Sequence, residues 1–275
     1  MRDAIYSLYF KLALKSKGKF FILLFNFQSF LFKKRMKIRF LHDENVFLVE
    51  EGSLSRRFVS ERVATICYWK GLTHRGHFLA KSIFLDSVPI SSNDIVVDCG
   101  ANVGDLEIYF REKNINCKYL AFEPSPREYY CLKKNIEYGE TFNLGLWEES
   151  KNLEFFISEQ NSDSSFIEPP KFTSKINVPA RRLDEIVEIG IKFLKVEAEG
   201  GEPEVLYGCQ KILHLIEWIA VDVGFERGVS QENTLSEVSN FLITNGFSLE
   251  KFISPTGRWV ALFKNSRISN EQKTL

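Results

Sequence analysis

The sequence lacks most features that mark metal-bound, disulfide-bonded or nucleic-acid-binding proteins. Its five cysteines form no C-x-x-C pair and no zinc-ligand spacing, so we expect no metal site and buried free thiols. An odd number of cysteines without a secretory signal predicts a reducing, cytoplasmic location. Lysine and arginine number 36, as do aspartate and glutamate. This balance gives no overall field toward nucleic acid, and no nucleic-acid-binding motif is present, so we expect no such partner.

The sequence also has no apolar run of the roughly 20 residues that a membrane-spanning helix needs. The phenylalanine-rich run at 20–32 is shorter and contains Asn26, Gln28 and Ser29. A basic run follows it, where a signal peptide would have small residues for cleavage. Basic residues flank it on both sides, which fits an interfacial helix on an anionic membrane. A helix that packs within the protein or against another subunit fits as well. Membrane contact through residues 11–37 therefore stays one of two open interpretations.

The length of 275 residues suits one large α/β domain with an extension. Hydrophobic residues make up 44% and charged residues 26%, which is ordinary for a globular protein. From residue 91, short apolar strands alternate with helical patterns, which predicts βαβ units and a parallel sheet. We expect a basic N-terminal segment at 1–39, a lead-in subdomain at 40–90, the main domain at 91–265 and a frayed polar tail at 266–275.

The main domain is expected to contain strands at 95–97, 119–122, 142–147, 191–196 and 218–223. An extra strand is expected at 152–157, followed by a polar loop at 158–180 that ends in a strand-like stretch. A single helix should follow residue 203 and continue to 216, and the last strands, 247–253 and 259–263, should form a hairpin. Before residue 91, the pattern predicts two short strands within 37–50 and helices at 58–69 and 71–88.

Polar residues follow the first two strands of the main domain. Asp98 ends the first strand, and Gly100 and Gly104 allow the following loop to turn tightly. Glu123 ends the second strand, 19 residues after Gly104. About 20 residues is the usual separation from a glycine-rich loop to a carboxylate that binds ribose hydroxyls, and ligands bind beyond the carboxyl ends of such strands. The sequence therefore predicts a ligand that contains adenosine.

The glycine spacing favours S-adenosylmethionine over a dinucleotide. Asn102 stands where the G-x-G-x-x-G pattern has its middle glycine, so a pyrophosphate fits poorly. S-adenosylmethionine has no phosphate, and Asp98 can lie near its ammonium group. We expect it to contact Asp98, Gly100, Ala101, Asn102, Gly104, Glu123 and Pro124. The alternatives are an NAD-type oxidoreductase on a similar sheet, and a non-catalytic binding module that docks through the N-terminal segment.

Five stretches resemble the FkbM family of methyltransferases: V-V-D-C-G-A-N-V-G at 96–104, A-F-E-P-S-P at 121–126, R-L-D at 182–184, L-K-V-E-A-E-G at 194–200 and E-V-L-Y-G at 204–208. The stretch V-D-V-G-F-E-R-G at 221–228 is similar to some members, and the resemblance covers about residues 64–263. It implies a Rossmann-like class I methyltransferase fold, with a mostly parallel seven-stranded sheet and an antiparallel last strand. It also implies O-methylation, often of a sugar or glycan hydroxyl. Many members have aspartate where this chain has Glu197.

Carboxylates follow the fourth and fifth strands of the main domain and supply candidates for the transfer step. Methyl transfer depends on alignment, and a hydroxyl acceptor must also lose its proton to a base. We expect catalytic roles for Glu199, Glu197 and Asp222, and an ion pair between Lys195 and Glu197. We expect a small-molecule or glycan acceptor to contact Asp163, Ser164, Ser165, Glu202 and Glu226. The same oxygens could hold a divalent cation, although no motif supports one, and Glu202 could instead be a first-turn acid favoured by the helix dipole.

Overall fold

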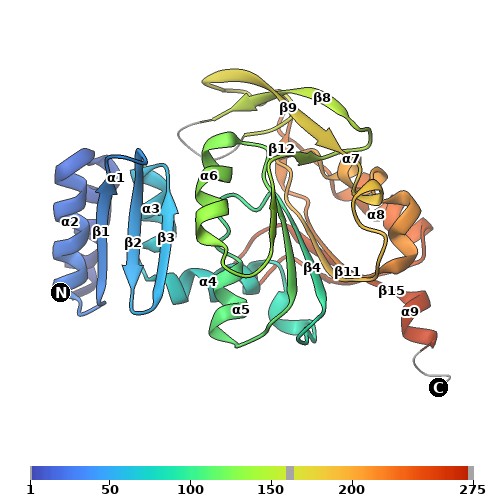
Figure 1. Ribbon diagram of the computed structural model, residues 1–275, viewed down its shortest axis with the longest axis horizontal. Coiled ribbons are helices and arrows are strands. Elements are labelled where there is room, and N and C mark those ends of the chain that lie inside the picture. Colours follow the sequence, from blue (N-terminus) through green and yellow to red (C-terminus); the bar gives the residue numbers. More distant parts are fainter. Residues whose placement is uncertain (1, 159–163, 272–275) are drawn as a thin grey trace.

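The structure, a computed structural model, describes residues 2–158 and 164–271. Its centre is a seven-stranded sheet (Figure 1). The strands lie in the order β14 (Phe247–Phe252), β15 (Val260–Asn265), β11 (Ile216–Asp222), β10 (Ile191–Val196), β4 (Ile95–Cys99), β5 (Lys118–Phe122), β6 (Glu140–Phe142). β15 runs antiparallel to both of its neighbours, and the pairs from β11 to β6 are parallel. The expected fold class, a mostly parallel sheet with an antiparallel last strand, is confirmed.

Helices cover both faces of this sheet, which is why its inner strands are continuous apolar runs. All five residues of β4 are buried. One face packs against α7 (Glu202–Tyr207), the 3₁₀ helix η3 (Gln210–Leu215) and α8 (Leu235–Thr244). The other packs against α4 (Leu72–Ser82), the 3₁₀ helix η1 (Leu85–Ser87), α5 (Glu107–Glu112) and α6 (Pro126–Asn135). The structure thus has three layers, with the ligand-side loops at one edge of the sheet.

The N-terminal part is a second packed unit. It consists of α1 (Arg2–Lys15), α2 (Gly18–Leu31), an antiparallel sheet of β1 (Met36–Leu41), β2 (Val46–Glu51) and β3 (Leu54–Phe58), and α3 (Glu61–Tyr68). Phe21 and Phe25 of α2 are fully buried in its core. We expected one segment to end and the next to begin near residue 39. β1 spans this position, and the core of the N-terminal unit contains residues from both sides of it. Among the described residues, no helix is long and apolar enough to cross a membrane.

The polar residues of α2 bind the free edge of β1. Asn26 exchanges two hydrogen bonds with the backbone of Ile38, at 2.9 and 2.7 Å, and Ser29 exchanges two with the backbone of Met36, at 2.8 and 3.0 Å. These side chains replace the neighbouring strand that an edge strand lacks. Two of the polar residues within the phenylalanine-rich run, Asn26 and Ser29, therefore hold α2 against the sheet.

Buried polar contacts attach the N-terminal unit to the main domain. The guanidinium of Arg56 is fully buried and forms an ion pair with Glu107 of α5. The side chain of Asn135 in α6 accepts a hydrogen bond from the Arg57 backbone at 2.7 Å and donates one to the Val103 carbonyl at 2.8 Å. The sequence analysis did not predict β3, which carries Arg56 and Arg57. Two arginines in five residues make its buried positions unrecognisable from the sequence.

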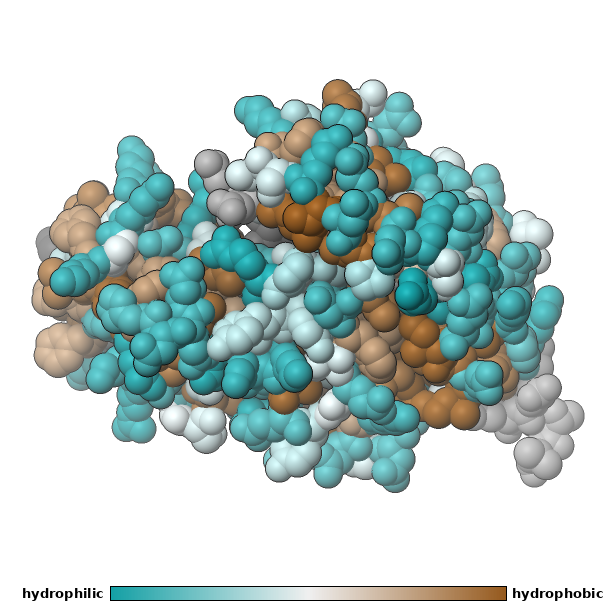
Figure 2. Space-filling model, turned by 45° about the horizontal axis from the view of Figure 1, so that its top comes forward, coloured by the Kyte–Doolittle hydropathy of each residue, from teal (hydrophilic) through white to brown (hydrophobic). Residues whose placement is uncertain are grey.

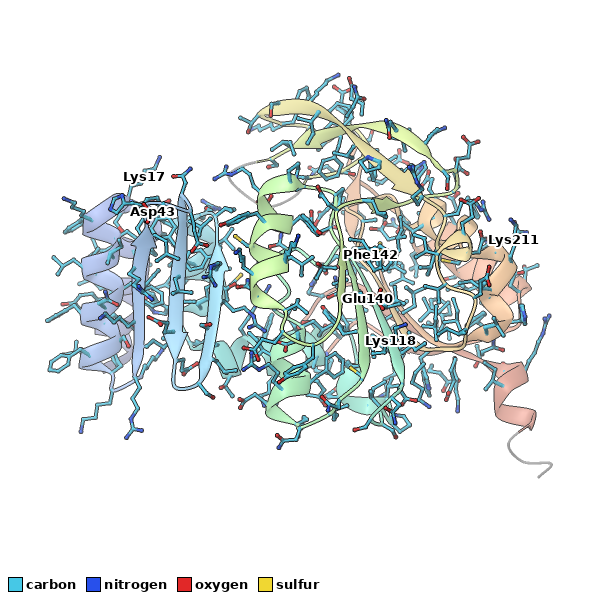
Figure 3. The ribbon with its side chains drawn as sticks, viewed as in Figure 1. Lys17, Asp43, Lys118, Glu140, Phe142 and Lys211 are labelled. Carbon is cyan, nitrogen blue, oxygen red and sulfur yellow. The ribbon has the colours of Figure 1, made fainter. Side chains whose placement is uncertain are left out.

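The structure differs from the expected elements at several places. The strand expected at 142–147 is divided into β6 and β7 (Gly145–Leu146), because Asn143 turns inward and donates hydrogen bonds to the carbonyls of Glu123 and Pro124. β7 joins a separate sheet with β9 (Ser174–Arg181) and β8 (Lys151–Ile157). β8 is the extra strand that we expected, and β9 occupies the end of the segment expected to be a loop. On the edge strand β6, Glu140 and Phe142 face β5, where Lys118 lies 3.4 Å from Glu140 (Figure 3).

Two further differences lie toward the C-terminus. The single helix expected as far as residue 216 breaks at Gly208, where an added Cβ would lie 2.1 Å from the Trp147 carbonyl oxygen. Residues 266–271, expected to be frayed, form the short helix α9 (Ser266–Glu271). A small hairpin, β12 (Phe225–Arg227) and β13 (Glu232–Asn233), was not expected. It matters because it carries Glu226 to the site.

Candidate active site

A cavity of about 430 Å³ opens at the carboxyl ends of β4, β5 and β10. Its walls come from the loop after β4, from α3 and α4, and from strands β7 and β8 of the small sheet. Of the seven residues expected to bind the cofactor, the structure brings six to this cavity: Asp98, Gly100, Ala101, Asn102, Glu123 and Pro124. Gly104 does not line it. A Cβ at Gly104 would lie 2.8 Å from Leu132 and Ile136, so its role is to let α6 approach the loop.

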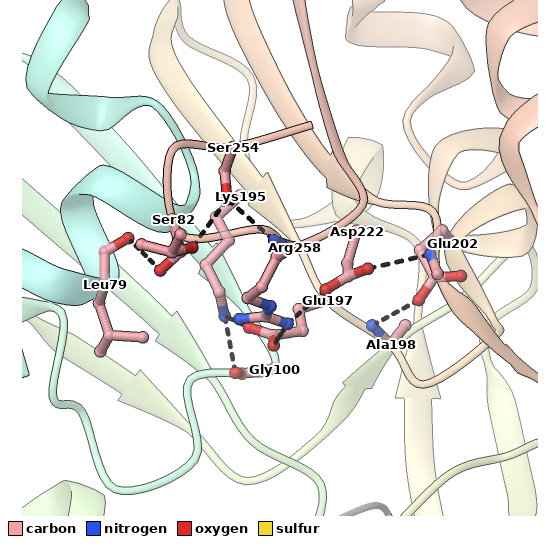
Figure 4. A network of polar contacts seen from close by, with 12 residues as sticks. Leu79, Ser82, Gly100, Lys195, Glu197, Ala198, Glu202, Asp222, Ser254 and Arg258 are labelled. Carbon is pink, nitrogen blue, oxygen red and sulfur yellow. Dashed lines mark hydrogen bonds and ion pairs between the residues drawn. The ribbon is translucent and has the colours of Figure 1, made fainter. Parts of the chain in front are cut away.

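The loop after β4 is shaped by close contact with the loop after β10. At Gly100 the backbone has a φ of +74°, and an added Cβ would lie 1.9 Å from the carbonyl oxygen of Glu197. Only glycine fits both conditions. The ammonium of Lys195 then donates a hydrogen bond to the Gly100 carbonyl at 2.8 Å (Figure 4). The Glu197 carbonyl and the Lys195 ammonium therefore hold the turn that faces the cavity.

Glu123 is a buried carboxylate at the wall of the cavity, with 7% of its surface exposed. One of its oxygens accepts a hydrogen bond from the backbone N–H of Asn102 at 2.8 Å, and the other accepts one from Ser125 at 2.9 Å. Burial, together with the nearby charge of Glu128, raises the pKa of Glu123 to about 8. The two backbone bonds fix the carboxylate in place and leave acceptor sites on both of its oxygens.

Asp98 lines the cavity but is already paired within the protein. One oxygen accepts a hydrogen bond from Lys195 at 2.7 Å, and the other accepts one from the hydroxyl of Tyr119. We had expected Asp98 to lie beside the ammonium of a ligand; the structure places it at the cavity and shows it paired with Lys195. The geometry gives Asp98 the task of positioning Lys195, which in turn supports the Gly100 turn.

Arg258, which the sequence analysis missed, links two of the expected catalytic carboxylates. Its guanidinium contacts both Glu197 and Asp222, and Lys195 lies 3.1 Å from Glu197 on the other side (Figure 4). Burial alone would raise the pKa of Glu197, but the charges of Arg258 and Lys195 outweigh it and hold this pKa well below its usual range. The expected ion pair between Lys195 and Glu197 is confirmed. Glu197 is thus held as an anion, a state that suits a positioning residue better than a base.

The pairing register of β15 with β11 is the one signal that would have pointed to Arg258 as a site residue. β15 pairs with β11 so that Val260 lies opposite Asp222. A residue two positions before Val260 therefore reaches the same edge of the sheet as the end of β11. Asp222 itself is buried and does not line the cavity, since Arg258 lies between it and the open space.

Glu226 and Glu199 line the cavity, as does Glu197. The carboxylate of Glu226 receives no hydrogen bond from any residue that the structure describes. Burial and the charges of Asp222, Glu197 and Glu202 raise its pKa to about 8. The neighbouring Arg227 anchors this position, because its guanidinium lies 2.6 Å from Glu204 of α7.

The remaining expected substrate residues are distributed differently. Ser164 lines the cavity, whereas Ser165 is buried and its hydroxyl donates to the Glu199 carbonyl at 2.8 Å. Glu202 is 1% exposed, does not line the cavity, and accepts hydrogen bonds from the backbone of Ala198 and Gly200 at 3.0 and 3.1 Å. This position favours a loop-holding role over the substrate contact that we expected. Asp163 lies outside the described residues.

The positions of these side chains also determine whether the site can hold a metal ion. Within residues 2–158 and 164–271, no group of three His, Cys, Asp or Glu side chains is arranged to hold one. A cation is nevertheless present between two of the candidate ligands, because the guanidinium of Arg258 bridges Glu197 and Asp222.

Comparison with known proteins identifies the family. The model of the methyltransferase FkbM domain matches residues 98–249. Methyltransferase 1 of Beauveria bassiana (strain ARSEF 2860) is 25% identical over 201 residues, which cover 60% of this chain and 81% of that protein. Methyltransferase sdnD of Sordaria araneosa is 25% identical over 213 residues, which cover 61% of this chain and 82% of that protein.

A crystal structure of methyltransferase FkbM from Methylobacillus flagellatus KT aligns with a TM-score of 0.49 at 15% identity. The alignment covers 74% of this chain and 52% of that one, so the chain spans about half the length of this relative. The family match rests on the sequence, since the FkbM domain model covers more than half of the 275 residues. The chain therefore belongs to the FkbM family of methyltransferases.

Proposed function

We propose that the protein transfers a methyl group from S-adenosylmethionine to a hydroxyl group of a small-molecule or glycan acceptor. One observation carries the proposal: a single cavity has the buried carboxylate of Glu123 at one part of its wall and the open carboxylate of Glu226 at another. The first suits a ribose, and the second suits a hydroxyl that must lose a proton.

The residues at the cofactor end fit S-adenosylmethionine. A carboxylate offers about four acceptor sites, and the backbone takes two of those on Glu123, so two remain for the ribose hydroxyls. Arg75 of α4 lines the cavity and provides a cation for the carboxylate of the methionine part. Asp98 and Asp105 also line the cavity, paired with Lys195 and Arg75 respectively, and their charges suit the ammonium group. A volume of about 430 Å³ lies within the usual range for small-ligand sites. When bound, S-adenosylmethionine supplies an electrophilic methyl group on a sulfonium centre.

The acceptor end assigns proton removal to Glu226. Its oxygens have no partner within the described part of the chain, and a pKa of about 8 allows it to accept a proton near neutral pH. It would take the proton of the acceptor hydroxyl while the hydroxyl oxygen bonds to the methyl carbon, the methyl–sulfur bond breaks and S-adenosylhomocysteine leaves. Glu199 lines the same part of the cavity and is placed to hold a second hydroxyl of the acceptor. Glu197 and Asp222 act through Arg258, which they position.

A methyl-transfer screen tests the proposed reaction. The protein is incubated with S-adenosylmethionine labelled in its methyl group and with cell glycan and lipid extracts. We expect a labelled product that resists alkali, because a methyl ether survives conditions that release methanol from a methyl ester. Label recovered as methanol, or attached to nitrogen, would reject a hydroxyl acceptor. In a parallel titration, S-adenosylhomocysteine should bind and NADH should not; the reverse result would favour the oxidoreductase interpretation.

The role of Glu226 is tested with the acceptor found in this screen. Glu226→Gln keeps the size of the side chain but cannot accept the proton, so kcat should fall by roughly 10²- to 10⁴-fold. The affinity for S-adenosylhomocysteine should stay within about twofold of the wild-type value, since Glu226 lies at the acceptor end. The exposed Glu188→Gln is the matched control. Normal turnover in Glu226→Gln, with a reduced rate in Glu199→Gln, would move the role of base to Glu199.

A further inference from the structure

The outer surface of helices α1 and α2 is apolar, and no described part of the chain covers it. Seven large hydrophobic side chains there are between 44% and 79% exposed: Leu8, Leu12, Phe20, Leu23, Phe27, Phe30 and Leu31. We call these seven residues the outer apolar face. Figure 2 shows apolar side chains gathered at the left end of the molecule, where Figure 1 places the two helices. Single exposed hydrophobic residues are common, but a contiguous group marks a contact surface.

This face is separate from the core of the N-terminal unit. In α2, Phe21, Phe25, Gln28 and Ser29 point inward and are buried. The exposed residues of α2 recur at three- and four-residue steps on the opposite side of the helix. A surface helix usually presents polar side chains to water, so α2 is apolar beyond what the packing of its own unit requires.

A strong positive charge surrounds the outer apolar face. Residues 1–42 contain ten lysines and arginines and one aspartate, although the whole chain is neutral. The exposed basic residues at the two ends of α2 are Lys15, Lys17, Lys19, Lys33, Arg35 and Lys37. Lys17, between the two helices, points away from the protein (Figure 3). Apolar side chains flanked by basic ones are the combination that binds the headgroup region of an anionic membrane.

We propose that the outer apolar face of α1 and α2 docks on the surface of a membrane that contains anionic lipid. The apolar side chains enter the headgroup region while the lysines and arginines contact lipid phosphates. The charge argues against a second copy of this chain as the occupant, because a symmetric contact would bring the same basic residues of both copies together. α3 packs against this helix pair, and its residues Val63, Ile66 and Cys67 line the active-site cavity. The docked surface is therefore one helix away from the site.

Vesicle sedimentation of the full chain tests the proposal. We expect the protein to sediment with vesicles of phosphatidylcholine that contain one third phosphatidylglycerol, and to stay in solution with pure phosphatidylcholine. Lys15→Glu with Lys19→Glu should reduce the bound fraction by more than roughly tenfold, since each basic residue near the surface contributes several-fold to binding. Lys113→Glu, at an exposed site in the main domain, is the matched control and should bind normally.

The apolar contribution is tested separately. Leu23→Ser with Phe30→Ser should also release the protein from anionic vesicles, whereas Tyr138→Ser, which changes a side chain of similar exposure elsewhere, should not. Because both replaced side chains point outward, circular dichroism should show unchanged folding. The proposal is overturned if the wild-type protein does not sediment with anionic vesicles. It is also overturned if light scattering shows a dimer that Leu23→Ser with Phe30→Ser converts to monomer, since the face would then join two subunits.

Discussion

Replacing Glu123 with glutamine should weaken cofactor binding strongly, although it changes a single atom type. Both oxygens of Glu123 accept backbone hydrogen bonds, at 2.8 Å from Asn102 and 2.9 Å from Ser125. In Glu123→Gln, one of these N–H groups must face the amide NH₂, which cannot accept. The ribose also exchanges a bond to a charged oxygen, worth roughly 1.5–3 kcal/mol, for a neutral one or none. The combined loss is about 3 kcal/mol, or roughly 100-fold in Kd for S-adenosylhomocysteine.

The pH dependence of binding provides a sharper test. The pKa of Glu123 is raised to about 8, first by burial and then by Glu128, so below pH 8 most of the free protein carries the protonated acid. If the ionised carboxylate binds two ribose hydroxyls, as we propose, the affinity should rise with pH. With a pKa of about 8, the ionised fraction increases roughly tenfold between pH 7 and pH 9, and Kd should fall by about the same factor.

Isothermal titration calorimetry with S-adenosylhomocysteine measures both effects. Glu123→Gln should show a weak and nearly pH-independent Kd. Glu226→Gln is the matched control, because Glu226 has a similarly raised pKa in the same cavity but lies at the acceptor end. It should retain the wild-type pH profile. An unchanged Kd in Glu123→Gln, or a pH profile that disappears in Glu226→Gln instead, would refute the assignment of Glu123 to the ribose.

Two further outcomes follow from the packing around the site. Gly100→Ala places a Cβ 1.9 Å from the Glu197 carbonyl oxygen at a φ of +74°, so the free energy of unfolding should fall by at least about 2 kcal/mol in urea denaturation; an unchanged midpoint would show that the two loops separate easily. Burial raises the pKa of Glu202 to about 7, so the stability that this group contributes is complete below pH 4.5 and is lost as the pH rises through 7. Glu202→Gln keeps an oxygen for Ala198 and Gly200 without the charge. Between pH 5 and pH 8, the unfolding free energy of Glu202→Gln should therefore drop by roughly 2 kcal/mol less than that of the wild-type protein. An equal drop in the variant and the wild-type protein would contradict the raised pKa of Glu202.

The sequence predicted the parts of the site that depend on strand order alone. Parallel strands place their carboxyl ends at one edge of a sheet, so the residues after β4 and β5 had to lie together once the strands were recognised. Six of the seven residues expected at the cofactor end do line the cavity. Gly104 was grouped with them because both glycines belong to one motif, but its partners Leu132 and Ile136 come from α6 and from the residue that follows it, and sequence spacing does not place α6.

The acceptor end was harder to predict, because its chemistry depends on contacts between distant segments. Arg258 reaches Glu197 and Asp222 from the turn between β14 and β15, and this contact decides which carboxylates are paired. Glu226 is presented by a hairpin, β12–β13, that is too short to give a recognisable pattern. The sequence indicated which acids gather at this end of the sheet, and only the fold separates the paired members from the open one.

The attachment of the N-terminal unit has a practical consequence for the design of shortened proteins. Arg56 is the fully buried partner of Glu107, and Val103, Ile108 and Cys131 of the main domain complete the core of the N-terminal unit. Removing everything before α3 would take away the buried cation closest to the Glu107 carboxylate, leaving Arg111 at 3.8 Å, and expose this apolar surface to water, which costs several kcal/mol. We expect such a truncated catalytic domain to aggregate. Replacing only the outward-facing side chains of α1 and α2 is therefore the better way to reduce non-specific association of the enzyme for crystallisation.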